Sequence, residues 1–155
     1  MKKSMTVFIT LAVLAAGGAA WAADTNTLTV QASVTGTCKF VAATSALNFG
    51  ALDPAIAVDV NGSTTTQFWC TKGLQTLVTL AADLGLNPAG GTRQMKDSVS
   101  TDLIPYSLTL TPDGGTNQGP ASPRLLTISG TVLGANFAGK SEGNYSDTVL
   151  LTFTP

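Results

Sequence analysis

Residues 27–34 read TLTVQASV, and this stretch decides how the fold is to be understood. Its apolar residues Leu28, Val30, Ala32 and Val34 alternate with polar ones. Period-two alternation predicts a β-strand that buries one face only. The stretch precedes both cysteines, so no disulfide ties it to the rest of the chain. It is therefore either the first strand of an ordinary β-domain or an arm that binds another molecule.

The N-terminus has the three parts of a secretory signal peptide. Lys2 and Lys3 precede an apolar run, which ends at the sequence AWA of residues 20–22. Small residues on both sides of the tryptophan predict cleavage after Ala22, with cleavage after Ala20 as the second choice. An uncleaved anchor helix needs about 20 apolar residues, and two glycines interrupt this run early. We therefore expect residues 1–22 to be removed on export.

The rest of the chain has the length and composition of one globular domain. Residues 23–155 suffice for a hydrophobic core of their own. After loss of the two N-terminal lysines, six Lys and Arg residues oppose nine Asp and Glu residues, a formal charge of −3. So weak a charge argues against nucleic acid or an anionic membrane surface as the partner.

The only two cysteines, Cys38 and Cys70, both lie in the exported part. In an oxidising compartment an even pair predicts one disulfide, which would contribute roughly 3–4 kcal/mol for a loop of this length. Two separate buried thiols are the other interpretation. Because the chain has no histidine and no further cysteine, a structural zinc site is not expected.

Short apolar or alternating runs separated by turn residues continue to the C-terminus. Asn61-Gly62 is the strongest hairpin signal, the segment around Pro88 and Gly91 through Lys96 predicts a loop, and Gly130 predicts a bend or bulge. No amphipathic helix, internal repeat or linker is evident, so we expect one all-β sandwich domain. The expected strands cover residues 38–42, 56–60, 64–70, 74–81, 104–111, 126–132 and 145–153.

The residues that catalysis requires are missing. Without histidine, Ser-His-Asp and Cys-His mechanisms are excluded, and the scattered carboxylates lie mostly near turns, where Asp is common. Trp69 is either a core residue beside the cysteines or an exposed platform for a ligand, and Arg93 is either a solvated loop residue or a carboxylate ligand. We expect no enzyme, no cofactor and no small-molecule substrate.

Several short motifs resemble those of the spore coat U domain family. Residues 47–54 read LNFGALDP, residues 70–73 read CTKG, and residues 143–149 read GNYSDTV. The segments at 93–95 and 106–108 also fit, and the motifs occur in family order across nearly the whole exported chain. The chain departs from the family pattern at residues 74–77, where a tyrosine is usual and none is present.

This resemblance implies a subunit of an archaic chaperone–usher pilus of Gram-negative bacteria. In that family the fold is an immunoglobulin-like sandwich that lacks its last strand. A periplasmic chaperone fills the gap first, and the N-terminal arm of another subunit replaces the chaperone at the outer-membrane usher. The resemblance thus implies export to the periplasm and then to a surface pilus for adhesion and biofilm formation, with residues 23–36 as the donor arm and residues 37–155 as the sandwich.

In this interpretation Leu28, Val30, Ala32 and Val34 are the side chains that fill the gap, with Ala32 in the shallowest position. Their burial would contribute about 5–10 kcal/mol before the cost of ordering the arm. Repeated head to tail, the contact does not close on itself and builds a filament. The other interpretations are an arm that forms the first strand of its own domain, and a secreted binding module or coat protein without pilus assembly.

Overall fold

The computed structural model describes residues 23–73 and 78–154. The chain divides into two units, Met1–Ser33 and Val34–Pro155, and the strands assigned in the described residues all lie in the second. These elements are β1 (Cys38–Phe40), β2 (Val60–Cys70), β3 (Thr79–Ala82), β4 (Arg93–Asp97), β5 (Leu103–Pro112), β6 (Arg124–Val132), α1 (Gly134–Phe137), β7 (Tyr145–Ser146) and β8 (Leu151–Thr154). The expected all-β sandwich is confirmed.

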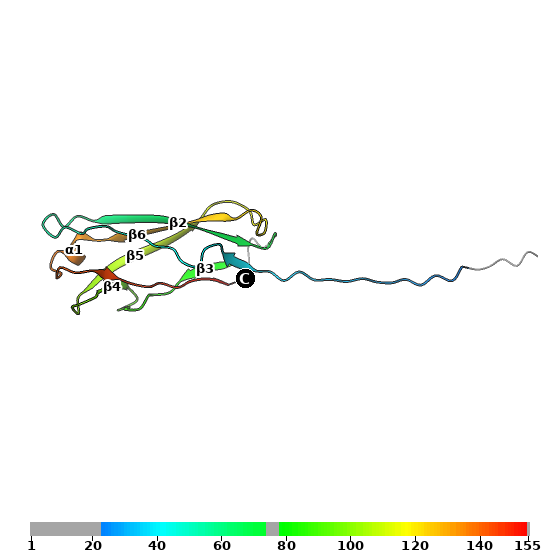
Figure 1. The fold of residues 1–155 in the computed structure, drawn as a ribbon, viewed down its shortest axis with the longest axis horizontal. Coiled ribbons are helices and arrows are strands. Elements are labelled where there is room, and N and C mark those ends of the chain that lie inside the picture. Colours follow the sequence, from blue (N-terminus) through cyan, green and yellow to red (C-terminus); the bar gives the residue numbers. More distant parts are fainter. Residues whose placement is uncertain (1–22, 74–77, 155) are drawn as a thin grey trace, which may run out of the picture. The chain divides into compact units, whose positions relative to one another are not determined.

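Two antiparallel sheets make up the sandwich (Figure 1). The first has the strand order β1-β2-β6-β5-β4-β7, and the second pairs β3 with β8. Within the first sheet, β5 changes its partner along its length: residues 103–106 pair with β4, and residues 107–112 pair with β6. The core lies between the layers, where alternate residues of β2, β5 and β6 are buried.

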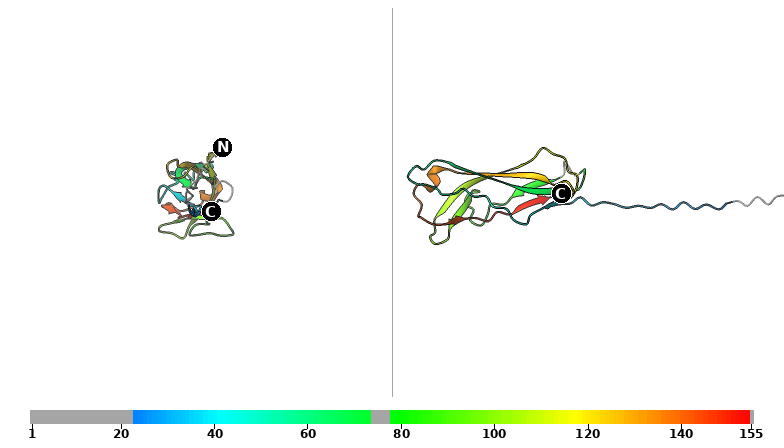
Figure 2. Two further views of the ribbon diagram at one scale, coloured as in Figure 1. Left: turned by 90° about the vertical axis from the view of Figure 1, so that its right-hand side faces the viewer. Right: turned by 45° about the horizontal axis from the view of Figure 1, so that its top comes forward.

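The domain has two distinct ends (Figures 1 and 2). At one end, which we call the root end, lie β1, the last residues of β2 and the first of β6, with Cys38 opposite Cys70 and Phe68 opposite Arg124. The other end, the α1 end, holds the single-turn helix α1 and the loop of residues 98–102. The 11 residues of β2 connect the ends, a span of about 33–37 Å for an extended strand.

Asn61-Gly62 does not form the predicted hairpin. Both residues lie inside β2, opposite Thr131 and Gly130 of β6. A Cβ at Gly62 would lie 3.1 Å from the Asn48 carbonyl oxygen. Glycine at this position therefore allows β2 and the segment around Asn48 to pack closely. The turn preference of Asn-Gly could not indicate this.

Gly130 likewise marks close packing and not the predicted bend or bulge. β6 pairs without interruption on both sides of it, with Gly62 in β2 and Leu108 in β5. A Cβ there would lie 2.8 Å from the Ser107 carbonyl oxygen and 2.9 Å from the Phe49 ring. The prediction was wrong because the sequence shows the glycine and not its neighbours.

Three further predictions of local structure change. The predicted loop through residue 96 contains a strand, β4, which has only one apolar residue, Met95, and so gives no alternating pattern in the sequence. The predicted strand 145–153 is divided into β7 and β8, which pair with β4 and β3 respectively. Of the predicted strand 74–81, residues 74–77 lie outside the described residues, and β3 is exposed on one face at Thr79 and Ala81, not covered on both.

Candidate functional site

An apolar groove runs along the sandwich between two segments that do not pair with each other. The first wall, as we call it, consists of residues 44–52, which follow β1 and carry no strand assignment. The second wall consists of residues 143–153, which contain β7 and the start of β8, each the terminal strand of its sheet. An antiparallel sandwich normally has a strand at such a place, so both walls are open edges.

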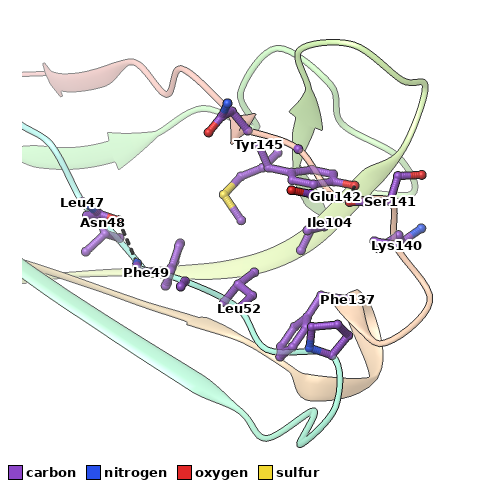
Figure 3. Close-up of a pocket in the computed structure, with 16 residues that line it drawn as sticks. Leu47, Asn48, Phe49, Leu52, Ile104, Phe137, Lys140, Ser141, Glu142 and Tyr145 are labelled. Carbon is purple, nitrogen blue, oxygen red and sulfur yellow. Dashed lines mark hydrogen bonds between the residues drawn. The ribbon is translucent and has the colours of Figure 1, made fainter.

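Cavities of about 650 Å³ and 320 Å³ occupy the groove. The larger lies at the α1 end, where Leu52, Ile104, Phe137 and Tyr145 face a common space (Figure 3). The smaller continues toward the root end, over Tyr106, Leu108 and Ile128. The groove floor is therefore made of core residues, of which Ile104, Tyr106 and Ile128 are buried and Leu108 is half-buried.

The second wall alternates in the way expected of a strand. Tyr145, Val149 and Leu151 are half-buried and line the cavities, whereas Thr148 and Leu150 are exposed. Its outer side is paired, since Asp97 lies opposite Tyr145 and the Asp83 amide donates to the Leu150 carbonyl oxygen at 3.0 Å. Among the described residues, its groove side has no strand beside it.

The first wall alternates too and is held by the glycines of the sheet beneath it. Leu47 and Phe49 are half-buried toward the groove, between exposed neighbours. The absence of side chains at Gly62 and Gly130 leaves the space in which Leu47 and Phe49 lie. At Gly50, whose φ is 74°, the amide donates to the Asn48 side-chain oxygen at 2.8 Å and turns the segment toward Leu52.

Hydrogen bonds to Asp147 fix the second wall. Its carboxylate accepts from the Tyr106 hydroxyl at 2.7 Å and from the Leu86 amide at 2.8 Å. Burial of Tyr106 and its hydrogen bond to this carboxylate raise the pKa of the tyrosine far above its ordinary value. Asp83 continues the connection by accepting from the Leu150 amide at 2.9 Å. The wall thus keeps its position without a strand on its groove side.

At the root end the groove is closed. Cys38 and Cys70 form the predicted disulfide, and Phe153 stacks against Phe40 and Phe68 with ring centroids 4.7 Å and 4.9 Å apart. Trp69, on the other face of β2 from Phe68 and Cys70, is half-buried opposite Lys39. The open part of the groove therefore extends from these rings to the α1 end.

The four predicted arm residues lie in a segment without helix or strand assignment. Leu28, Val30 and Val34 are 82%, 83% and 85% exposed, and Ala32 is exposed as well. Large apolar side chains exposed at every second position are unusual for a protein that acts alone. Residues 1–22, the predicted signal peptide, lie outside the described residues.

The family resemblance implied a gap in the sandwich, but sequence reasoning did not locate it. The motifs at residues 47–54 and 143–149 indicated a family, but nothing in them indicated that these two segments are the walls of one groove. The sequence feature that could have located the groove is the alternation of apolar and polar residues on both segments. This alternation is also typical of an ordinary strand with neighbours, so it did not indicate an open edge. Arg93, expected in a loop, lies in β4 and donates to the carbonyl oxygens of Asp83 and Ala82 at 2.7 Å and 2.9 Å.

Within residues 23–73 and 78–154, no group of three or more Cys, His, Asp or Glu residues is placed to hold a metal ion. In the same residues no helix has the length and hydropathy needed to cross a membrane.

The family model of the Spore Coat Protein U domain matches residues 24–152 and so covers both the arm and the groove. A search of curated proteins found no match.

Proposed function

The chain belongs to the Spore Coat Protein U domain family, and we propose that it is a structural subunit of a surface pilus that polymerises by donor-strand complementation. Residues 27–34 of one copy fill the groove of the next. The observation that carries this proposal is a groove with two open edges and an apolar floor in a chain whose N-terminal segment exposes alternating apolar side chains. An added strand supplies the missing ladder hydrogen bonds, and its alternate side chains fill the cavities.

The spacing of the arm fits the spacing of the floor. Leu28 and Val34 are six residues apart, and so are Ile104 and Leu110, the outermost of four alternate residues on the inner face of β5. Six residues of extended chain span about 20 Å in either case. Of these four positions, Ile104, Tyr106 and Leu108 lie on the groove floor, and Leu110 lies beyond it against the cluster at the root end. The arm side chains from Val34 toward Leu28 therefore follow the floor from the α1 end to its closed end.

Filament growth requires one direction of insertion. Each arm begins at the root end, where the Thr71 amide donates to the Thr37 carbonyl oxygen at 2.8 Å. If an arm enters the acceptor's groove from the α1 end, the donor's root end lies at the acceptor's α1 end, and successive copies stack head to tail. If it entered from the root end, the root ends of the donor, of the acceptor and of the copy that holds the acceptor's own arm would all have to lie in one place. The arm thus lies antiparallel to the second wall, with Val34 near Ile104 and Leu28 near Leu151.

Before assembly the open groove needs another occupant. A periplasmic chaperone that lends a strand meets this need, and an outer-membrane usher is the place of exchange. We include the chaperone and the usher in this proposal as partners. We also include removal of residues 1–22 on export and a final location in a surface pilus that serves adhesion and biofilm formation. The role is structural, without catalysis, cofactor, nucleic acid or small-molecule substrate.

Deletion of residues 23–34 tests the proposal. The truncated subunit should still fold with its chaperone but form no polymers, as judged by electron microscopy and sedimentation. A variant with Gln31→Ala, which changes the polar face of the arm and keeps all four apolar residues, is the matched control and should polymerise. Polymers of the truncated subunit, or a truncated subunit that is a stable monomer without chaperone, would refute the proposal.

A self-complemented variant tests the direction of insertion. The second wall ends at the root end, where Leu28 is placed, so a short turn after Pro155 followed by a second copy of residues 24–36 should fill the groove of its own chain. With residues 23–34 also deleted from its N-terminus, this variant should be a stable monomer. If it aggregates while the same fusion with the arm sequence reversed is stable, the direction is wrong.

A further inference from the structure

The two ends of the domain carry opposite charge. At the root end, Lys39 and Lys72 are exposed, and the third cation, Arg124, pairs with Asp113 at 2.7 Å. At the α1 end, five carboxylates oppose the two lysines Lys96 and Lys140. These carboxylates belong to Asp53, Asp59, Asp97, Asp102 and Glu142, of which Asp53, Asp59 and Glu142 are exposed.

Contacts within the domain place these carboxylates at the α1 end. Asp59 accepts from the Gly134 amide, which begins α1, at 2.9 Å. Asp102 accepts from the Ser141 amide at 2.9 Å, and hydrogen bonding from Ser141 lowers the pKa of this carboxyl, which keeps it ionised at neutral pH. Figure 3 shows Glu142 and Lys140 on the rim of the larger cavity.

Apolar side chains accompany this charge. Ile56, Val58 and Leu133 are 65%, 56% and 49% exposed. They lie close together, because the Ala57 carbonyl group touches the position that a side chain at Gly134 would occupy. The acidic end therefore combines apolar and charged surface, as protein interfaces do.

The length of the arm brings the opposite ends of two copies together. This step rests on the proposed function, in which Val34 of one copy is bound at the α1 end of another. Only residues 35–37 separate Val34 from Cys38, so the first strand of the donor copy begins at most about 14 Å from the bound Val34. Lys39 follows directly, and Lys72 lies two residues beyond Cys70, the disulfide partner of Cys38.

We propose that successive copies make a second contact besides the inserted arm, in which Lys39 and Lys72 of the donor copy meet Asp53, Asp59 and Glu142 of the acceptor copy around its exposed Ile56, Val58 and Leu133. The partner of this surface is thus a second copy of the chain. Opposite charges at this range attract, since the screening length is about 8 Å at physiological salt. The contact steers the root end of the donor toward the α1 end of the acceptor and sets how successive subunits are oriented.

Zero-length coupling with a carbodiimide tests the contact on the native polymer. The reagent joins an amine to a carboxylate that touches it, so amides should form between Lys39 or Lys72 and Asp53, Asp59 or Glu142. Because these groups lie at opposite ends of one domain, such a product joins two copies. The K39R/K72R variant keeps the charge but cannot couple, so it should polymerise normally and lose these products. Native polymers without them would overturn the proposal.

Charge reversal gives a second measurement. The K39E/K72E variant should polymerise roughly tenfold more slowly than the native subunit at 20 mM salt, with little difference at 0.5 M salt. The fourfold variant K39E/K72E/D53K/E142K restores complementarity and should regain the native rate. Arm-dependent polymers with equal rates in all three chains would overturn this contact and leave the proposed function intact, whereas polymers that do not need residues 23–34 would overturn both.

Discussion

The paired sheet and the two walls of the groove carry the same alternating pattern but differ in their partners. In β2, β5 and β6, the buried residues Phe68, Ile104 and Leu126 are 3%, 2% and 0% exposed, and each strand has neighbours. In the walls, the equivalent inward residues such as Phe49 and Val149 are only half-buried, and the backbone is largely unassigned. The difference teaches that alternation fixes which face is apolar, whereas a neighbouring chain decides whether the segment becomes a strand.

A charge on the apolar face of the arm should have the largest effect. Val30→Asp would bring a carboxylate into the groove without a partner, at a cost of several kcal/mol or more, and should abolish polymer formation in sedimentation assays. Gln31→Asp places the same charge on the opposite face and should leave most of the polymer. If both variants polymerise equally, the arm does not use one face.

Loss of the disulfide should come next, because this bond ties β1, which precedes the first wall, to β2. Replacing Cys38 and Cys70 together by serine should lower the free energy of unfolding of the self-complemented variant by roughly 3–4 kcal/mol. Denaturant titration measures this value. The control keeps the disulfide intact and removes the arm from the groove. If the free energy of unfolding then falls by as much, the stability comes from the filled groove and not from the disulfide.

Gly130→Val tests whether the sheet positions the first wall. The added side chain would displace Phe49 and press on the Ser107 carbonyl oxygen, so unfolding of the self-complemented variant should become easier by about 1–3 kcal/mol. At Gly114 an added Cβ would meet no atom within 4 Å, so Gly114→Ala is the matched control, for which less than about 0.5 kcal/mol is expected. Equal effects would mean that Phe49 is not held by the glycine.

Tyr106→Phe should have the smallest effect on the second wall. It removes one hydrogen bond to Asp147, at a cost of about 1 kcal/mol, measured by denaturant titration near pH 7. The raised pKa of Tyr106 also makes the free energy of unfolding depend on pH. In the unfolded chain the hydroxyl ionises near pH 10, whereas in the folded chain it stays protonated, so native stability should fall as pH rises above that value. The Phe variant should lose this part of the alkaline dependence, and an unchanged dependence would contradict the assigned hydrogen bond.

Much of the fold could be predicted because burial follows local pattern. A strand was expected over residues 104–111, where β5 lies, and Cys38 and Cys70 were expected to pair. The predictions that were wrong depended on residues distant in the sequence. Gly62 and Gly130 are required by the close packing of Leu47 and Phe49, and β4 is a strand because β5 and β7 lie beside it. The missing strand was implied by the family resemblance alone, and the local pattern could not show that residues 44–52 and 143–153 border the gap.

Photocrosslinking from the arm in native polymers tests the central claim most directly. With a benzophenone amino acid at position 28 or at position 34, mass spectrometry identifies the residues of the neighbouring copy that are captured. We expect position 34 to capture residues around Ile104 and Phe137, and position 28 to capture residues around Leu110 and Leu151. Capture within the same copy, outside the groove, or with the two positions exchanged would contradict an arm that lies antiparallel to the second wall of another copy.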